Sequence, residues 1–200
     1  RKPAKITMSI EETIKLFPDS ETELLLGHAL RKPKEFLYTH PSKKLTPSQQ
    51  KTFKALLKRR QKGEPIAYLL GYKYFFGLRF KVTKDTLSPR PETEWVVEHI
   101  TQLVSSKQLA VNSLLDLGTG SGCIAVSVKI NLPKIKVTSS DVSTKALTIA
   151  KQNARTHKTK IDFIHSNLLS NLKNKSFNII IANLPYGWAT WNKKKKKNNI

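Results

Sequence analysis

The segment Asn183-Leu184-Pro185-Tyr186 places an amide, a proline and an aromatic ring at the end of the apolar run 177–182. Such a run is typical of a buried strand, and the proline ends it. A planar NH2 group is a poor nucleophile, and a site can help by accepting both of its N–H groups. The side-chain oxygen of Asn183 and the main-chain carbonyl of Leu184 suit this role, because Pro185 favours an extended conformation of Leu184. The face of the Tyr186 ring can pack on the planar NH2 group. It can also favour positive charge on a methyl group that is being transferred to that nitrogen.

A glycine loop, Asp116-Leu117-Gly118-Thr119-Gly120-Ser121-Gly122, lies upstream between an expected strand and an expected helix. Such a loop lets the backbone approach a ligand closely and offers helix N-terminal amides. Its spacing is typical of S-adenosylmethionine (SAM) binding, rather than of the Gly-x-Gly-x-x-Gly loop of dinucleotide enzymes. Asp141 ends the next strand, where it can accept both ribose hydroxyls; alone, it would instead suit a helix N-cap. Together the motifs predict a methyltransferase acting on a planar NH2 group.

The surrounding patterns predict an α/β fold with an N-terminal helical domain, a β-hairpin linker and a partial Rossmann-like SAM-dependent methyltransferase sheet. Residues 1–65 carry helical spacing and form the expected substrate-recognition domain, and residues 66–90 are the linker, with an aromatic hairpin over 68–82. Residues 91–190 alternate strands and helices, with strands expected at 114–117, 136–141, 161–164 and 177–182 and helices at 123–129 and 143–156. The lysine-rich tail 191–200 has no periodicity and is predicted to be disordered.

The net charge, the cysteine content and the absence of long apolar runs limit the kinds of partner that the sequence predicts. Lys and Arg number 36 against 14 acidic residues, which gives a net charge of +22. This excess favours an anionic partner such as ribosomal RNA, although a lysine-rich proteome would produce the same surface. The single cysteine, Cys123, excludes internal disulfides and Cys-rich zinc sites and is expected to be a buried structural thiol. With neither a long apolar run nor a signal segment, we expect no membrane or metal partner and a cytoplasmic location.

Residues 9–190 resemble the N5-glutamine methyltransferases of peptide chain release factors, the HemK/PrmC family. The resemblance is carried by six segments: Pro65-Ile66-Ala67-Tyr68, Phe76-Gly77-Leu78-Arg79-Phe80-Lys81-Val82, Pro89-Arg90-Pro91-Glu92-Thr93-Glu94, Asp116 to Gly122, Asp141, and Asn183 to Tyr186. The Pro-Arg-Pro-Glu-Thr-Glu segment is the specific one, because the related ribosomal-protein glutamine methyltransferases diverge there.

The resemblance implies methyl transfer from SAM to the glutamine side chain of a Gly-Gly-Gln loop in class 1 release factors, which the helical segment would grip. The implied catalytic residues are Asn183, Pro185 and Tyr186. The implied cofactor-binding residues are Gly118, Thr119, Gly120, Ser121, Gly122, Asp141, Asn167, Leu168 and Asn183. The implied substrate-binding residues are Asn183, Leu184, Pro185, Tyr186, Arg90 and Glu92, with no metal.

The chain departs from the family in three places. Leu184 replaces the usual proline, and Asn-Leu-Pro-Tyr is also typical of rRNA adenine N6-dimethyltransferases. Asn167 replaces the usual acidic residue, which makes it a weaker acceptor for an adenine amino group. Family sheets have more strands than the four expected here, so we expect a C-terminally truncated fragment or a frameshifted frame. The Lys/Asn tail fits A-rich codons, and Arg1 leads us to expect that the N-terminus is not native. Whether such a fragment is active stays open.

Two other functions stay open. An adenine N6-methyltransferase acting on rRNA or DNA is supported by Asn-Leu-Pro-Tyr and by the charge, and opposed by the helical segment and Pro-Arg-Pro-Glu-Thr-Glu. A non-catalytic fragment that keeps SAM or partner binding is the third hypothesis.

Overall fold

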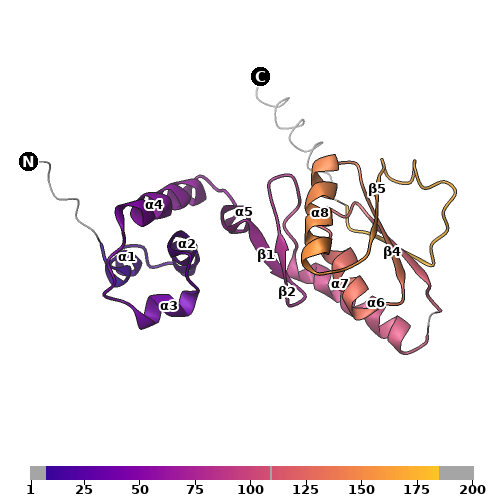
Figure 1. Cartoon of the computed structure of the whole chain (residues 1–200), viewed down its shortest axis with the longest axis horizontal. Coiled ribbons are helices and arrows are strands. Elements are labelled where there is room, and N and C mark those ends of the chain that lie inside the picture. The colour runs from indigo at the N-terminus through magenta and orange to yellow at the C-terminus, as the bar shows by residue number, and fades with distance from the viewer. Residues whose placement is uncertain (1–7, 109, 185–200) are drawn as a thin grey trace, which may run out of the picture. The chain divides into compact units, whose positions relative to one another are not determined.

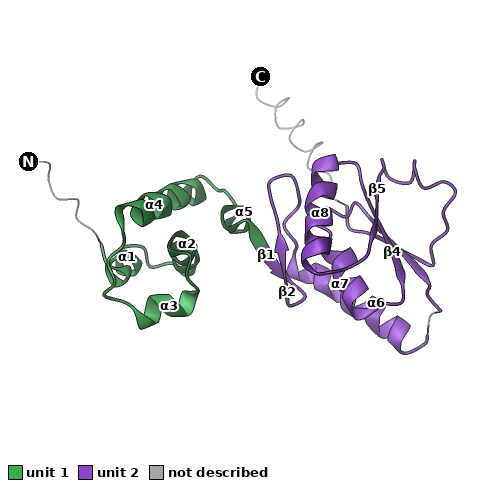
Figure 2. Cartoon of the chain, viewed as in Figure 1, with its two compact units in different colours: residues 1–72 green, residues 73–200 purple. Residues whose placement is uncertain are grey.

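A computed structural model describes residues 8–108 and 110–184 (Figure 1). The chain divides into two compact units, and the boundary falls between Tyr72 and Lys73 (Figure 2). The first unit therefore extends beyond the expected limit at residue 65. The reason is helix α5 (Ile66–Leu70), which begins after Pro65 and ends at Gly71 in the left-handed conformation, φ 77°. The hairpin expected from residue 68 is wrong at its start, because these residues form the last helix of the first unit.

The first unit is helical, with α1 (Ile10–Leu16), α2 (Ser20–Leu30), α3 (Lys34–Thr39) and α4 (Pro47–Gln61) before α5. Capping boxes start α1 and α4, where Ser9 and Thr46 accept from the main-chain amides of Glu12 and Gln49. Apolar side chains from all five helices form one core. Helix α3 was not expected, because it buries only Leu37 and is too short to show a helical period.

The second unit begins at Lys73, inside a hairpin of β1 (Tyr72–Phe75) and β2 (Leu78–Lys81). Phe75 and Phe80 point into the core of this unit, with ring centroids 6.2 Å apart. The buried side chain of Asn153 holds the second strand: it accepts from the Lys81 amide at 2.8 Å and donates to the Lys81 carbonyl at 3.0 Å. It also donates to the Ser121 carbonyl at 2.8 Å, so one side chain joins the hairpin to the glycine loop.

A four-stranded parallel sheet in the order β5-β4-β3-β6 follows, which confirms the expected fold class. Its strands are β3 (Ser113–Leu117), β4 (Lys136–Asp141), β5 (Asp162–His165) and β6 (Ile179–Ala182). The chain runs outward from β3 to β5 and returns to the other side of β3, so β3 is where the strand order reverses. Open α/β sheets bind ligands at the carboxyl ends of strands beside such a point.

The two faces of the sheet are covered differently. The turn η1 (Pro91–Thr93) leads into α6 (Glu94–Ser105), and this helix packs with α7 (Cys123–Asn131) and α8 (Thr144–Thr156) over one face (Figure 1). The other face buries Leu115 and Leu117 against Leu172 from the connection between β5 and β6. Among the described residues, no helix has the length and apolar character needed to span a membrane.

Strand β6 begins later than the expected residue 177. The side chain of Asn178 turns back and accepts from the main-chain amides of Asn112 and Ser113, at 2.9 and 3.0 Å. The main-chain amide of Asn178 also donates to the Ser113 carbonyl at 3.1 Å, so this residue binds the start of β3 through both its side chain and its main chain. The ladder then aligns Leu117 with Ala182, so the glycine loop and Asn183 leave the sheet side by side.

Candidate active site

The glycine loop takes a conformation that only glycine adopts easily. Gly118, Gly120 and Gly122 have φ of 73°, 56° and 79°. The amides of Gly118 and Thr119 both donate to the Ser140 carbonyl, at 2.8 and 2.9 Å, which ties the loop to the end of β4. At Gly120 no described atom lies within 4 Å of where a Cβ would stand, so the loop leaves a clear approach for a ligand.

Gly122 has a different role, because it lets two helices approach. A Cβ there would stand 3.0 Å from the Ala150 Cβ and 3.2 Å from its Cα. Helices α7 and α8 therefore pack closely at the base of the loop, and the loop's backbone is positioned by the helix pair.

Asp141 joins the glycine loop to α8. Its Oδ2 accepts from the Gly120 amide at 2.9 Å, and its Oδ1 accepts from the Ser143 amide at 2.8 Å. The N-cap of α8 is Ser143, whose hydroxyl accepts from the Ala146 amide, so Asp141 is not the cap itself. Each carboxylate oxygen has two acceptor positions, and Asp141 keeps the capacity to accept from ligand hydroxyls.

A pocket lies over these groups at the carboxyl ends of β3, β4 and β5. Gly118, Gly120, Asp141, Asn167 and Leu168 line it, as do Asn183 and Leu184. Sequence reasoning missed the segment 85–87, which follows the hairpin and closes one side of the pocket. No local pattern marks this segment, because only the packing of the hairpin carries it there. Thr119, Ser121 and Gly122 are not among the lining residues.

The wall of this pocket combines polar and apolar groups. Val142 and Leu168 are 63% and 55% exposed, so apolar side chains lie beside the carboxylate of Asp141 in this wall. A ligand with hydroxyl groups and a flat apolar part would satisfy both, and the adenosyl part of SAM has this chemistry. The residues present therefore fit the cofactor expected from the sequence. No cluster of His, Cys, Asp or Glu in the described ranges could hold a metal ion.

Asp116 supports the loop from below. It is 1% exposed, and the Thr119 hydroxyl donates to its Oδ2 at 2.6 Å. Burial raises the pKa of Asp116 to about 6, and the hydrogen bond from Thr119 opposes that rise. The same burial raises the pKa of the Cys123 thiol to about 12, so this cysteine is a buried structural residue, as expected.

The pKa of Asp116 has a measurable consequence for stability. The folded-state pKa lies above the ordinary value of 3.8, so the protonated form of Asp116 favours the folded protein. This contribution to the free energy of unfolding is fully present below pH 4 and is lost as pH rises through 6, by up to about 3 kcal/mol. Asp116→Asn carries no titrating group, so its free energy of unfolding should lack this fall. Urea unfolding between pH 4 and 7 measures the difference between the two proteins. Asp162→Asn is the charge-matched control, and parallel curves for wild type and Asp116→Asn would contradict the prediction.

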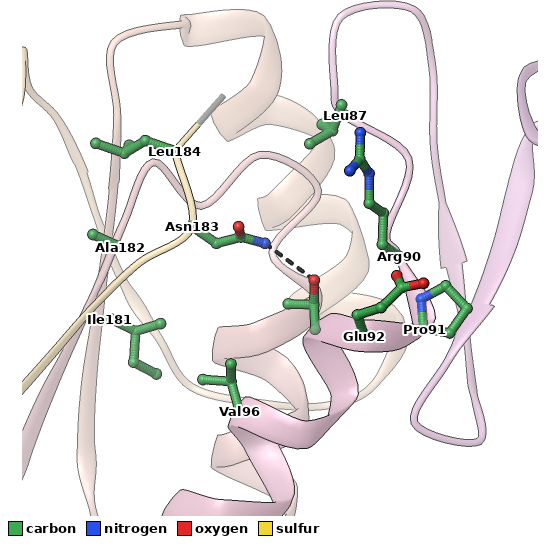
Figure 3. Close-up of a pocket in the computed structure, with 10 residues that line it drawn as sticks. Leu87, Arg90, Pro91, Glu92, Val96, Ile181, Ala182, Asn183 and Leu184 are labelled. Carbon is green, nitrogen blue, oxygen red and sulfur yellow. Dashed lines mark hydrogen bonds between the residues drawn. The ribbon is translucent and has the colours of Figure 1, made fainter. Parts of the chain in front are cut away.

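A second pocket, of about 710 Å³, also has Asn183 in its lining (Figure 3). Arg90 and Glu92 line it from the segment before α6, and Asn183 and Leu184 line it from the end of β6. Asn183 Nδ2 donates to the Thr93 hydroxyl at 3.1 Å. The structure thus brings four of the residues expected to bind substrate around one cavity.

Three residues line both pockets: Leu87, Asn183 and Leu184. The side chain of Leu184 lies against the glycine loop: a Cβ on Gly118 would stand 2.5 Å from the Leu184 Cδ2. A group in the larger pocket and a group over the glycine loop would therefore meet across Asn183. Pro185 and Tyr186 lie outside the described residues, and the roles expected for them stay predictions.

Comparison with known families gives two matches. The methyltransferase small domain family matches residues 93–197, and the PrmC N-terminal domain matches residues 15–71.

Curated relatives match most of the chain. The release factor glutamine methyltransferase of Coxiella burnetii is 42% identical over 176 residues, covering 87% of this chain and 62% of that protein. The protein of the same name from Chlorobaculum tepidum is 37% identical over 186 residues, covering 86% and 63%. The bifunctional methyltransferase of Rickettsia bellii is 35% identical over 195 residues, covering 84% and 35%. The chain thus spans less than two thirds of the length of these relatives.

Among solved structures, the Thermus thermophilus 16S rRNA N2 G1207 methyltransferase, in complex with AdoMet and guanosine, superposes with a TM-score of 0.50. It is 16% identical, and the match covers 58% of this chain and 33% of that one. At this identity the likeness concerns the fold alone.

Proposed function

Since the chain belongs to the methyltransferase small domain family and carries a PrmC N-terminal domain, we propose that it methylates a glutamine side chain of a peptide chain release factor. The family resemblance drawn from the sequence motifs is confirmed by these matches and by the relatives named release factor glutamine methyltransferase. The observation that carries the proposal is the position of Asn183, on the wall between a glycine-loop pocket and a larger cavity. The same proposal places the protein in the cytoplasm, where release factors act.

SAM is the cofactor of this proposal, and it supplies the electrophilic methyl group when bound. Gly118, Gly120 and Asp141 would hold its ribose and methionine parts, and Asn167 and Leu168 would hold its adenine. The support is the open backbone at Gly120 and the carboxylate of Asp141 at the same pocket.

Asp141→Ala tests the cofactor site. The variant loses a charged acceptor for ribose hydroxyls and the partner of the Gly120 amide, so we expect SAM affinity to fall about 10- to 100-fold. Asp141→Asn keeps one acceptor oxygen and should fall less. Isothermal titration calorimetry measures both variants, and wild-type affinity in Asp141→Ala would exclude the carboxylate from the site.

The glutamine side-chain amide that receives the methyl group would lie in the larger pocket. Asn183 Nδ2 is bonded to Thr93, so Oδ1 is the atom of this side chain that can accept from the substrate NH2 group. The main-chain carbonyl of Leu184 is the proposed second acceptor. These two hydrogen-bond acceptors would hold the glutamine nitrogen in line with the methyl group of SAM. Orientation of this kind lowers the activation barrier without first ionising the nitrogen.

Labelled SAM distinguishes the three hypotheses. The chain is incubated with purified release factor, with a factor whose Gly-Gly-Gln glutamine is changed to alanine, and with rRNA. We expect label in the first alone. Label only in rRNA would establish the adenine N6-methyltransferase, and SAM binding without transfer to any acceptor would establish the non-catalytic fragment.

We further propose that α4 contacts an anionic partner, with RNA of the ribosome as the candidate. The helix contains no acidic residue. Its two arginines are already paired, Arg59 with Glu64 and Arg60 with Glu21. The lysines of this region are therefore the positive charges available to bind an anionic partner.

Four of these lysines form a row. Lys51, Lys54, Lys58 and Lys62 are exposed and recur every three or four residues, opposite the buried side of α4. None of them is in an ion pair within the described part of the chain. Apart from Ala55, the row has no apolar side chain beside it to anchor a protein. Point charges in a line suit a phosphate backbone better.

The salt dependence of RNA binding tests the row. The quadruple Lys→Gln variant at these positions should lower the slope of log affinity against log salt by about 3, at roughly 0.7 per lysine for a single strand. Fluorescence anisotropy with a labelled single-stranded RNA measures the slope. Lys→Gln at four exposed positions of the second unit, Lys151, Lys160, Lys173 and Lys175, is the matched control. Equal losses in both variants would contradict a site on α4.

A further inference from the structure

Thr93 stands at the junction of η1 and α6, and its side chain faces the end of β6. Its hydroxyl accepts from Asn183 Nδ2 at 3.1 Å, across 90 residues of sequence. The side chain is 9% exposed. Figure 3 shows Asn183 pointing its nitrogen at this hydroxyl and turning Oδ1 away from it. One contact therefore joins the Pro-Arg-Pro-Glu-Thr-Glu and Asn-Leu-Pro-Tyr segments.

Thr93 differs from the three hydroxyl residues that cap helices in this protein. Ser9, Thr46 and Ser143 have extended backbones, and their hydroxyls accept from the first-turn amides of α1, α4 and α8. Thr93 precedes α6 with φ −74° and ψ −18°, and its hydroxyl makes no capping bond. Thr93 already lies in the helical turn η1 that runs into α6, so its hydroxyl is not used as a cap and contacts Asn183 instead.

The backbone around Thr93 is held firmly. Its amide donates to the Arg90 carbonyl at 3.1 Å, and Val97 one turn later is fully buried in the core of the second unit. The hydroxyl is thus presented from a rigid helix start, which is the kind of support that holds a reacting group in a productive geometry.

We propose that Thr93 is a positioning residue for the methyl transfer reaction: its hydroxyl holds the Asn183 carboxamide in the place where Oδ1 faces the substrate nitrogen that receives the methyl group. This inference rests on the proposed function. A carboxamide turned by 180° presents NH2 where an acceptor is needed, and it would then oppose the substrate NH2 group. A hydroxyl can bond either end of a carboxamide, so the contact with Thr93 fixes the place of the Asn183 side chain, and in the observed orientation Nδ2 faces Thr93.

Thr93→Val removes the hydroxyl and keeps the shape of the side chain. We expect kcat for glutamine methylation to fall about 10- to 30-fold, since an Asn183 carboxamide that is no longer held in place orients the substrate nitrogen poorly. The SAM dissociation constant and the KM for the release factor should change less than kcat, within about threefold, because the other residues that line the two pockets are unchanged in this variant. Thr93→Ser restores the hydroxyl and should return kcat to within about threefold of wild type. Thr101→Val makes the same change on α6 away from the pocket and should leave kcat unchanged.

A second measurement needs neither cofactor nor substrate. In ¹⁵N-labelled protein, the Asn183 side-chain NH2 signals are assigned by their loss in Asn183→Ala. Thr93→Val should speed exchange of these protons with water at least severalfold, and Thr93→Ser should restore wild-type exchange. Thr101→Val should not change them.

The outcomes separate the two proposals. Methylation by wild type with an undiminished kcat in Thr93→Val overturns the role of Thr93 and leaves the proposed function standing. Unchanged exchange of the Asn183 protons in Thr93→Val also overturns it. A folded wild type that binds SAM and methylates no release factor overturns the proposed function, and the positioning role falls with it. A selective loss of kcat with faster exchange, both reversed by serine, supports the inference.

Discussion

Asn183→Ala is expected to lower methyl transfer to the release factor glutamine by about 10²- to 10³-fold, which is the usual effect of losing one well-placed polar contact to a reacting group. The variant removes the side-chain acceptor at the wall between the two pockets. The main-chain carbonyl of Leu184 remains, and it can hold only one of the two N–H groups. Steady-state rates at saturating labelled SAM measure the effect.

Saturation with SAM matters in this experiment. Asn183 also lines the glycine-loop pocket, so its loss is expected to weaken cofactor binding, and a rate at low SAM would mix the two effects. Asn174→Ala, at an exposed asparagine of the connection before β6, is the matched control and should keep the wild-type rate. An undiminished rate in Asn183→Ala would remove the basis of the proposed chemistry.

Asn153→Ala is expected to lower the free energy of unfolding of the second unit by about 3–6 kcal/mol. The side chain is 1% exposed and makes three hydrogen bonds of 2.8 to 3.0 Å to main-chain groups of Lys81 and Ser121. Its loss leaves those groups without this partner, at about 1–3 kcal/mol each where they stay buried. Urea unfolding at constant pH measures the change.

The same variant should weaken SAM binding, because the Ser121 carbonyl belongs to the glycine loop. Asn131→Ala is the matched control, since Asn131 is exposed and donates one hydrogen bond to the Ser127 carbonyl. It should cost about 1 kcal/mol. A loss below 1 kcal/mol in Asn153→Ala would show that the hairpin is held by the packing of Phe75 and Phe80 alone.

Local patterns predicted most of the elements. Strand β4 has the predicted bounds, 136–141, and α8 differs from expectation only in that Ser143 is its cap. Two elements were missed or displaced for physical reasons. Helix α3 is shorter than two helical turns, and α5 occupies an aromatic, glycine-bounded stretch whose composition favours a strand. Short segments carry too few residues for periodicity to outweigh composition.

What the sequence by itself determined was the set of functional groups and the edge of the sheet where they gather. A glycine loop, Asp141 and Asn183 each follow a predicted strand, and parallel strands end at one edge. Tertiary structure alone decided which side chains meet there. The contact of Thr93 with Asn183 and that of Asn153 with Lys81 join residues 90 and 72 positions apart. Such contacts depend on how α6 and the hairpin pack on the sheet, and a local pattern holds no record of that packing.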